Sequence, residues 1–231
     1  MLEVRGLEAG YGPVQVLWEV ELDVGEGEIV ALVGSNGAGK TTLLRAISGL
    51  ISPTGGELRF DGRSLVGLPP EQIVELGIAH VPEGRRLFPG LTVRENLLAG
   101  AYASRGVADI DRAVGLFPRL GERLTQVAGS LSGGEQQMCA IARGLMSRPK
   151  LLMIDELSLG LAPKLVEDIL ERLEAVAEEG TALLVVEQDV DAALRIAARG
   201  YVLENGRIVA SGPSRELLED PRVREAYLGV A

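Results

Sequence analysis

Eight residues in the first quarter of the chain, Gly34 to Thr41, have the types and spacing of a loop that binds phosphate groups. The segment reads GSNGAGKT and matches G-x-x-x-x-G-K-T. Glycines adopt backbone conformations that other residues avoid, so successive amide groups can turn toward phosphate oxygens. Lys40 then supplies a charge to the β and γ phosphates, and Thr41 a hydroxyl to Mg²⁺. The residues expected to contact a nucleotide here are Gly34, Ser35, Asn36, Gly37, Ala38, Gly39, Lys40, Thr41 and Thr42.

The context of this loop favours nucleotide binding over an ordinary glycine-rich turn. An apolar strand pattern, EIVALV at 28–33, precedes the loop, and a helix pattern, TLLRAISGL at 42–50, follows it. A phosphate loop requires this order of strand, loop and helix, because the positive end of the helix then faces the phosphates. We therefore expect a bound nucleotide with Mg²⁺.

A second cluster of chemically active residues is the pair Asp155 and Glu156. Both follow the apolar run LLMI at 151–154, and carboxylates at the end of a core strand are costly to bury without a cationic or reactive partner. Beside a phosphate loop, Asp155 fits a carboxylate of the magnesium shell and Glu156 a general base for an attacking water. The alternative is that the pair merely marks the end of the strand.

The elements that must position these residues alternate between strands and helices. Strand patterns occur at 15–24, 57–63, 151–154, 181–186 and 201–209, and residues 87–149 read as short helices with a capping box at Thr92 and Glu95. A helix between the two last buried strands ends at Gly180, a hairpin turn falls at Asn205 and Gly206, and a short helix is expected near Tyr227. Such alternation predicts a mainly parallel sheet.

Composition limits the classes of protein that fit. The 231 residues are 46% hydrophobic and 24% charged, which suits one packed domain rather than a disordered chain. The net charge of −10 and the lack of a Lys/Arg run argue against a nucleic-acid partner. No apolar leader or membrane-spanning run is apparent, and the single Cys139 reads as a core residue in a reducing compartment.

The segment LSGGEQQ at 131–137 distinguishes between the classes of enzyme that contain a phosphate loop. Ser132 and Glu135 have capping-box spacing before an apolar helical pattern, which by itself indicates only a well-started helix. Together with the phosphate loop and the Asp-Glu pair, the segment resembles the signature motif of the ABC ATPase family. The resemblance implies that the signature residues hold the γ-phosphate of ATP bound by a second subunit, so the site belongs to a dimer; these residues are Ser132, Gly133, Gly134 and Glu135.

The resemblance covers essentially the whole chain and implies a fold. That fold is α/β: a P-loop NTPase core of the RecA-like type, with an N-terminal antiparallel β subdomain and an inserted α-helical subdomain. Residues 1–86 and 149–231 would form the ATP-binding core of the single domain 1–231, and residues 87–148 the helical signature subdomain. Tyr11 is similar to the aromatic residue that stacks on adenine, with an ordinary surface or core tyrosine as the alternative.

Several positions depart from the usual family pattern. Glu83 stands where most members have Gln, and it is expected near Mg²⁺ and the γ-phosphate; Gln188 stands where most have His, and it can donate a hydrogen bond without a titrating charge. Ala162 replaces an Asp that reaches across the dimer, and Leu157 replaces a Pro without an evident functional reason. The only histidine, His80, reads as structural. The segments VPEGRR-FP-LTVRENL, SLGLAP and VEQ together resemble the ATP-binding subunits of branched-chain amino acid importers, whereas Leu157 departs from that branch as well.

The resemblance implies an ATPase that drives uptake through a membrane without touching the substrate. Its partners would be a second ABC ATPase subunit, identical or paralogous, transmembrane permease subunits and, indirectly, an external substrate-binding protein. It would lie peripherally on the cytoplasmic face of the inner (plasma) membrane. The alternatives are the ATPase of a urea or amide importer, an ABC ATPase of a soluble assembly, and a small-molecule kinase, although a kinase leaves LSGGEQQ without a role.

Overall fold

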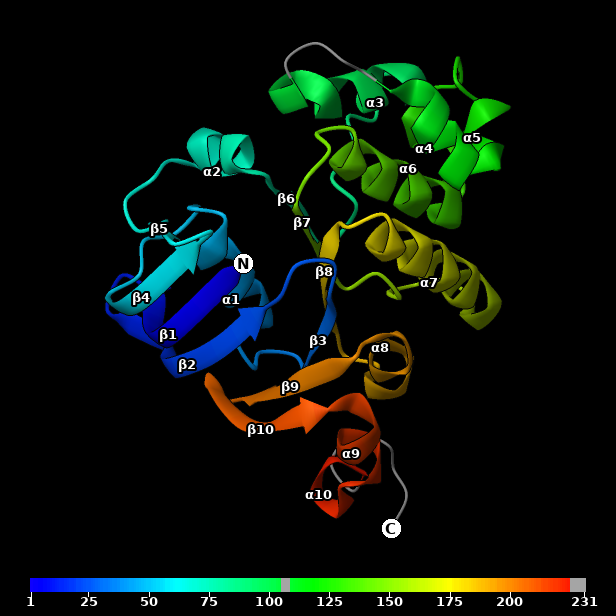
Figure 1. The fold of residues 1–231 in the computed structure, drawn as a ribbon. Coiled ribbons are helices and arrows are strands. Elements are labelled where there is room, and N and C mark those ends of the chain that lie inside the picture. Colours follow the sequence, from blue (N-terminus) through cyan, green and yellow to red (C-terminus); the bar gives the residue numbers. More distant parts are fainter. Residues whose placement is uncertain (105–108, 225–231) are drawn as a thin grey trace.

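Two β-sheets and a lobe of helices make up the protein. A computed structural model describes residues 1–104 and 109–224, so the short helix expected near Tyr227 lies outside the described residues. In Figure 1 the antiparallel sheet lies to one side of the central sheet, and the helices α6, α7 and α8 lie to the other side. No helix in the described part of the chain combines the length and the apolar character that a membrane crossing requires.

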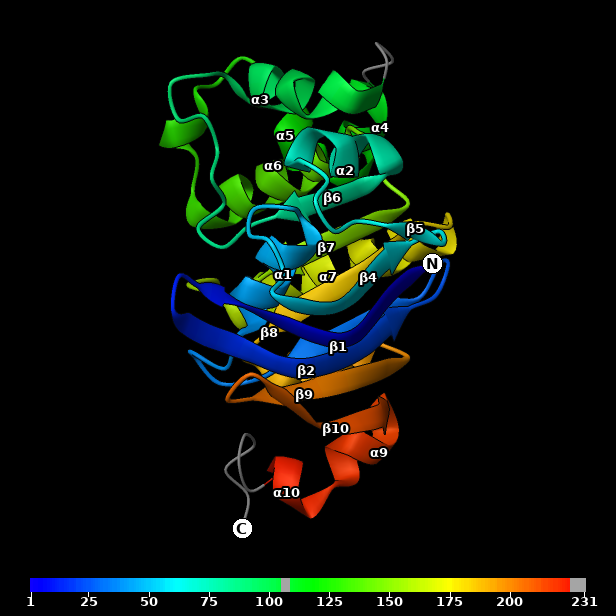
Figure 2. The ribbon, with the colours of Figure 1, turned by 90° about the vertical axis from the view of Figure 1, so that its left-hand side faces the viewer.

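The antiparallel sheet has four strands in the order β2-β1-β4-β5. Its strands are β1 (Leu2–Tyr11), β2 (Val14–Val24), β4 (Gly55–Phe60) and β5 (Arg63–Ser64). Inward and outward residues alternate along β1, as expected for a sheet with one buried face. Figure 2 shows this sheet in front of the central one.

The central sheet has six strands in the order β10-β9-β3-β8-β7-β6. Five are parallel, namely β3 (Ile29–Val33), β6 (Ile78–Val81), β7 (Leu151–Asp155), β8 (Ala182–Glu187) and β9 (Arg199–Glu204), and β10 (Arg207–Pro213) pairs antiparallel with β9. The hairpin expected at Asn205 and Gly206 is confirmed, because both have positive φ angles, 46° and 78°, as a two-residue hairpin turn requires.

The helices of the core pack on both faces of the central sheet. They are α1 (Lys40–Ile47), α2 (Pro70–Leu76), α7 (Pro163–Glu178), α8 (Val190–Ile196), α9 (Ser214–Glu219) and α10 (Pro221–Val223). Proline at the first position suits the start of α7, and Gly180, with φ 100°, follows its end, as the sequence predicts.

Between β6 and β7 the described chain forms short helices joined by loops. This lobe contains α3 (Val93–Gly100), η1 (Ala101–Ser104), α4 (Ile110–Leu116), α5 (Pro118–Gly121), η2 (Ala128–Ser130) and α6 (Gly133–Leu145). The predicted capping boxes at the starts of α3 and α6 are both present. The expected combination of a P-loop core, an antiparallel β subdomain and a helical insertion is confirmed.

The hydrophobic core lies on both sides of the central sheet, because residues alternate between its faces. On β3, Ala31 and Val33 belong to the cluster under the lobe, α7 and α8, whereas Val30 and Leu32 belong to the cluster under α1 and the antiparallel sheet. All of these side chains are fully buried. Such burial on both faces makes the strands rigid and fixes the polar residues at their carboxyl ends.

Candidate functional site

The loop from Gly34 to Gly39 joins β3 to α1 and has space only for glycine at its two ends. A β-carbon at Gly34 would lie 2.3 Å from the carbonyl oxygen of Leu203, and one at Gly39 would lie 2.8 Å from the side chain of Leu17. Gly39 also has φ 112°, in the left-handed region that favours glycine. No side chain caps the first turn of α1, so its amide groups can receive an anion.

Lys40, the first residue of α1, is only 4% exposed. Its ammonium group donates hydrogen bonds to the carbonyl oxygens of Gly34 at 2.8 Å and Ser35 at 3.2 Å. It also forms an ion pair with Oε1 of Glu156 at 3.2 Å. The structure therefore brings the expected phosphate-binding cation and the expected general base into direct contact.

Asp155 ends β7 and is completely buried. Its Oδ2 accepts a hydrogen bond from the Thr41 hydroxyl at 2.9 Å, whereas its Oδ1 is buried without a hydrogen-bond partner. Burial, with the charges of Glu156 and Glu83, raises the pKa of Asp155 to about 6, against the hydrogen bond from Thr41 and the charge of Lys40. This carboxylate therefore lacks the positive partner that its environment requires.

Thr41 and Asp155 fit a magnesium site. A hydroxyl and a carboxylate oxygen without a hydrogen-bond partner are oxygen ligands of the kind that Mg²⁺ prefers, and Mg²⁺ usually takes one or two protein ligands beside phosphates. No group of three His, Cys, Asp or Glu side chains gathers as a metal site among the described residues. The arrangement thus suits a metal shared with a nucleotide rather than a site made by protein alone.

Glu156 follows Asp155 and leaves the strand in an unusual conformation. Its φ angle is 50°, which is strained for a residue other than glycine. Its amide donates to the carbonyl oxygen of Val186 at 2.8 Å, and its side chain is 11% exposed. A strained backbone at the end of a core strand turns this carboxylate out of the sheet and toward Lys40.

Three further residues expected at the site lie around this group. The Tyr11 hydroxyl lies 3.5 Å from Oγ1 of Thr42 and accepts a hydrogen bond from Arg45 at 3.0 Å, so it is next to the start of α1. Glu83 is exposed after β6, and its charge acts on Asp155. Gln188 is exposed directly after β8.

The signature residues form a separate part of the surface. Ser132 caps α6: its hydroxyl accepts from the amide of Glu135 at 3.4 Å, and the Glu135 carboxylate accepts from the amide of Ser132 at 2.9 Å. Glu135 also pairs with Arg123 at 2.7 Å. Both views of the ribbon place α6 in the helical lobe and α1 beneath the antiparallel sheet (Figures 1 and 2). Gly133 and Gly134 start α6 beside Ser132.

A strained segment between β6 and the lobe contacts α6, and the sequence did not reveal it. Gly84, Arg85 and Arg86 all have positive φ angles, 75°, 65° and 44°. Arg143 of α6 donates hydrogen bonds to the carbonyl oxygens of Arg86 at 2.8 Å and Arg85 at 3.3 Å, and its guanidinium lies over the Phe88 ring. Arg143 therefore ties the segment after Glu83 to the signature helix.

Two other residues near the site were missed or left unexplained by sequence. Glu187 ends β8 and is 2% exposed, although a carboxylate after the buried strand TALLVV is the same signal that identified Asp155. Leu157 is fully buried in the cluster between the sheet, the lobe and α7. Leucine at that position is therefore explained by core packing.

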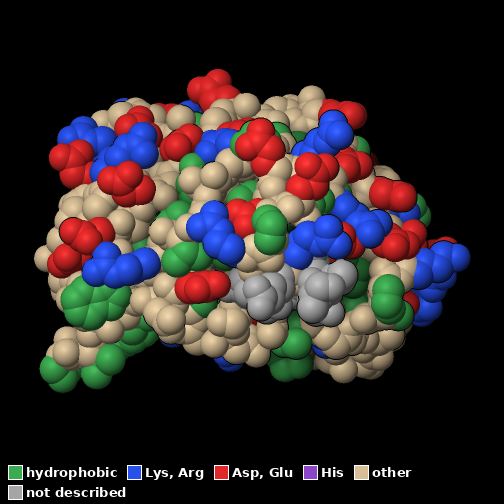
Figure 3. Space-filling view, turned by 90° about the horizontal axis from the view of Figure 1, so that it is seen from below, with side chains coloured by type: hydrophobic (Ala, Val, Ile, Leu, Met, Phe, Trp, Pro, Cys, Tyr) green, Lys and Arg blue, Asp and Glu red, His purple; other side chains and the backbone are tan. Residues whose placement is uncertain are grey.

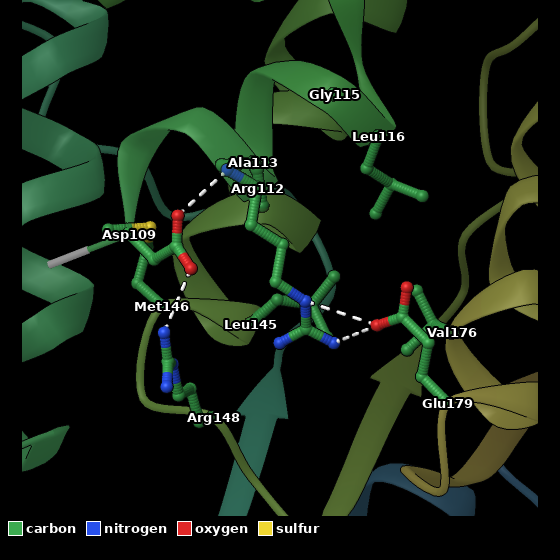
Figure 4. A pocket seen from close by; sticks show the side chains of 11 residues that line it. Asp109, Arg112, Ala113, Gly115, Leu116, Leu145, Met146, Arg148, Val176 and Glu179 are labelled. Carbon is green, nitrogen blue, oxygen red and sulfur yellow. Dashed lines mark hydrogen bonds and ion pairs between the residues drawn. The ribbon is translucent and has the colours of Figure 1, made fainter. Parts of the chain in front are cut away.

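A cavity of about 320 Å³ lies elsewhere, where the lobe meets the core. Figure 4 shows Leu116 and Val176 beside it and two ion pairs at its rim, Arg112 with Glu179 at 2.5 Å and Arg148 with Asp109 at 2.8 Å. These pairs join α4 to the end of α7 and to the segment after α6. The cavity shares no lining residue with the phosphate loop, and we assign it no ligand.

Charges of both signs are mixed on the surface. On the face seen from below in Figure 3, Lys and Arg side chains alternate with Asp and Glu side chains over the described area. Several charges of the protein are paired; for example, Arg199 binds Asp23 and Glu28, and Arg207 binds Glu19.

Comparisons with known proteins agree with this geometry. The sequence model of the family described as ABC transporter matches residues 17–158, and a model described as Branched-chain amino acid ATP-binding cassette transporter matches residues 207–231. The chain is 49% identical to the high-affinity branched-chain amino acid transport ATP-binding protein BraG of Pseudomonas aeruginosa, over 99% of this chain and 100% of BraG. It is 38% identical to the probable branched-chain amino acid transport ATP-binding protein LivF of Archaeoglobus fulgidus, over 100% and 99% of the two chains.

Solved structures share the fold. The ADP conformation of MJ1267, an ATP-binding cassette of an ABC transporter, superposes with a TM-score of 0.86 at 27% identity, over 100% of this chain and 99% of that one. The dimeric bacterial ABC transporter cassette MJ0796 gives a TM-score of 0.83 at 28% identity, over 93% and 99%. The identity, the coverage and the matched motifs show that this chain belongs to the ATP-binding proteins of ABC transporters, of the branched-chain amino acid type.

Proposed function

We propose that this chain hydrolyses Mg²⁺-ATP between its own phosphate loop and the signature motif of a second subunit, and so drives the uptake of branched-chain amino acids. The carrying observation is the cluster at the ends of β3 and β7. There Lys40 contacts Glu156, and Thr41 contacts Asp155, whose other oxygen has no partner. One cation, one base and one pair of metal ligands meet at the start of a helix without a side-chain cap.

In this proposal each residue has one role. The amide groups of residues 34–42 and the ammonium of Lys40 bind the phosphates and balance their charge. Thr41 and Asp155 hold Mg²⁺, which when bound neutralises charge that develops on the phosphate oxygens. Glu156 accepts a proton from the attacking water, because its carboxylate lies 3.2 Å from the Lys40 ammonium group that binds the phosphates.

The surrounding residues refine this site. Tyr11 stacks on the adenine, since its hydroxyl lies 3.5 Å from Oγ1 of Thr42 and so places the side chain near the start of α1. Glu83 contributes a carboxylate near Mg²⁺, and Gln188 donates a hydrogen bond to the γ-phosphate. Because Gln188 carries no titrating proton, hydrolysis here should depend on Glu156 rather than on a histidine at that position.

A second ATPase subunit completes the site. Ser132, Gly133, Gly134 and the amide groups at the start of α6 belong to the lobe, and they suit an anion brought by another chain. The relatives of known structure include a dimeric cassette bound to ADP and phosphate in a post-hydrolysis state, with a TM-score of 0.81 at 26% identity. The partner would be identical or paralogous, and Glu135 would hold Ser132 in place through the capping box.

The transport function rests on the relatives and on the lobe. Two relatives are named for branched-chain amino acid transport and match almost the whole chain, and the lobe offers a helical surface for transmembrane permease subunits. The chain would then lie peripherally on the cytoplasmic face of the inner membrane and contact an external binding protein only indirectly. Urea and short amides are the competing cargo.

The test uses the complete transporter in proteoliposomes with its binding protein. We expect ATP-dependent uptake of radiolabelled leucine, and we expect Glu156→Gln to abolish both uptake and hydrolysis while it retains ATP binding. Glu174→Gln is a matched control, because it removes an exposed carboxylate on α7 outside the site. Near-normal hydrolysis by Glu156→Gln would contradict the role of the base. Uptake of urea without leucine would contradict the proposed cargo.

A further inference from the structure

Glu187 is a buried carboxylate to which the site described above gives no role. It ends β8, between the strands that lead to the phosphate loop and to Asp155, and it is 2% exposed. Burial raises its pKa, the charge of Glu156 raises it as well, and hydrogen bonds from Ser158 lower it. A carboxylate with so little contact with water is retained only where its partners compensate for the lost hydration.

Besides the backbone of Gln188, those partners are two groups of one residue, Ser158. The amide of Ser158 donates to Oε1 of Glu187 at 2.8 Å, and the Ser158 hydroxyl donates to Oε2 at 2.7 Å. Both oxygens of the carboxylate are thus engaged by a residue 29 positions earlier in the chain. We call this pair of hydrogen bonds the Glu187–Ser158 clamp. Hydrogen bonds to a charged acceptor are about twice as strong as neutral ones, so the clamp fixes the turn after β7 firmly.

Glu156 lies in a turn that is held at two points, by a backbone hydrogen bond of Glu156 itself and by the clamp two residues later. The amide of Glu156 donates to the carbonyl oxygen of Val186 at 2.8 Å, and Ser158, two residues later, binds Glu187. The last two residues of β8 therefore hold both ends of the strained turn in which Glu156 has φ 50°. In addition, the carbonyl oxygen of Glu187 accepts from the amide of Gly34 at 3.3 Å, so the same residue contacts the phosphate loop.

We propose that Glu187 is a positioning residue for ATP hydrolysis: through Ser158 it holds the turn that directs the Glu156 carboxylate toward Lys40 and the phosphates. This role rests on the proposed function. A residue other than glycine in the left-handed region is strained, and it persists there only where its surroundings hold it. When the clamp is removed, Glu156 can relax toward an ordinary conformation, and its carboxylate leaves the position that a general base requires.

The clamp also reaches the segment expected to face the second subunit. Ser158 begins the turn SLGLAP, which leads to α7 at Pro163. The buried carboxylate therefore ties that turn to the end of the central sheet. A change in the turn would move Glu156 through the same two hydrogen bonds.

The experiment compares Glu187→Gln, Ser158→Ala and Ser158→Thr in the complete transporter. Glutamine removes the charge and keeps one acceptor oxygen, so it can accept only one of the two Ser158 donors and turns a donating NH2 group toward the other. Alanine at 158 removes the hydroxyl, and threonine retains it. We expect kcat to fall about 10- to 100-fold in Glu187→Gln and Ser158→Ala, because small misplacements of a catalytic group have effects of that size. KM and the Kd for ATP should stay within about threefold, and Ser158→Thr should keep most of the activity.

Two further measurements separate positioning from general damage. The double variant of Glu187→Gln and Ser158→Ala should lose no more kcat than the less active of the two single variants, since both changes remove the same interaction. Glu28→Gln is the matched control, because the Glu28 carboxylate also accepts a backbone amide, that of Gly25, and a side-chain donor, Arg199, but precedes β3 at the opposite end of the strand from the phosphate loop. It should lower thermal stability without lowering kcat.

The outcomes distinguish this role from the proposed function. If the unchanged transporter hydrolyses no ATP, the proposed function fails. If the unchanged transporter hydrolyses ATP and the Glu156→Gln transporter does not, the proposed function holds. In that case a kcat of Ser158→Ala within about twofold of normal overturns only the positioning role of Glu187. Equal losses of kcat in Ser158→Ala and Ser158→Thr also overturn it, because the hydroxyl that threonine retains would then not contribute to kcat. The serine variants decide the question even if Glu187→Gln fails to fold.

Discussion

Replacing Asp155 with Asn should stabilise the protein near pH 8 without nucleotide and should remove most of the stabilisation that Mg²⁺-ATP provides. The buried carboxylate has a pKa raised from 3.8 to about 6, chiefly by burial. Above pH 6 the Asp155 carboxylate is therefore ionised in the folded protein, where its charge is less stable than it is in the unfolded chain. Asparagine keeps an acceptor oxygen for Thr41 and removes this charge.

The magnitude follows from the two pKa values. At 1.36 kcal/mol for each tenfold change in proton affinity, the difference between 3.8 and about 6 corresponds to about 3 kcal/mol as an upper limit. An acid whose pKa is raised by folding costs stability above its folded pKa, and this cost disappears as the pH falls toward its unfolded value. The gain from Asp155→Asn should thus be largest at pH 7–8 and near zero at about pH 4.

Urea denaturation of the unchanged chain and of Asp155→Asn from pH 4 to pH 8 measures this effect. The difference between their free energies of unfolding cancels the contributions of titrating groups that the two proteins share. Asp109→Asn is a control of opposite sign, because hydrogen bonds from the backbone of Arg112 and from Arg148 hold the pKa of Asp109 low. That variant should be destabilised at pH 8 and least affected at low pH. If Asp155→Asn is less stable than the unchanged chain at pH 8, the buried charge of Asp155 does not destabilise the folded protein.

Ligand linkage supplies the second half of this test. A ligand at 100 times its Kd stabilises the folded state by about 2.7 kcal/mol. The unchanged chain should show a gain of this order in Mg²⁺-ATP, measured by thermal unfolding, and Asp155→Asn should gain much less, because a ligand of the metal is lost. Equal gains in the two proteins would remove Asp155 from the metal site.

Three further predictions concern residues around the site. Gly34→Ala should abolish ATP binding or folding, because the new β-carbon would lie 2.3 Å from the carbonyl oxygen of Leu203; nucleotide titration and circular dichroism measure both, and a normal Kd would contradict it. Burial, with the charge of Arg45, lowers the pKa of His80 to about 4, so His80→Asn should reduce the loss of stability between pH 6.5 and pH 4 in acid denaturation; an unchanged pH profile would contradict this. A double-mutant cycle on Arg112 and Glu179 should give a coupling of at most about 1 kcal/mol, since both side chains are partly exposed; a larger value would assign the ion pair a structural role.

Local pattern was enough to predict much of the fold and to select the residues of the candidate site. The phosphate loop is recognisable because Gly34 and Gly39 have no space for a β-carbon and Lys40 must stand at a fixed point between strand and helix. The capping boxes at Thr92 and Ser132 depend on residues three positions apart, and such contacts leave a readable spacing.

Contacts between distant segments could not be predicted in this way. The ion pair of Lys40 with Glu156 and the clamp of Glu187 on Ser158 each join residues far apart in sequence, and no spacing rule encodes them. The same holds for Arg143, whose hydrogen bonds to the strained segment after Glu83 depend on how the lobe packs. Leu157 was unexplained in the sequence because only the packed core shows that it is buried.

The most direct test of the central claim is the fate of bound nucleotide in the complete transporter with Glu156→Gln. We expect labelled ATP to stay bound and unhydrolysed in this variant. If the two subunits are identical, formation of that complex should also require Ser132 of the opposing signature motif. The unchanged protein should convert the same ATP to ADP and phosphate. Conversion of ATP to ADP by Glu156→Gln at a near-normal rate would contradict it.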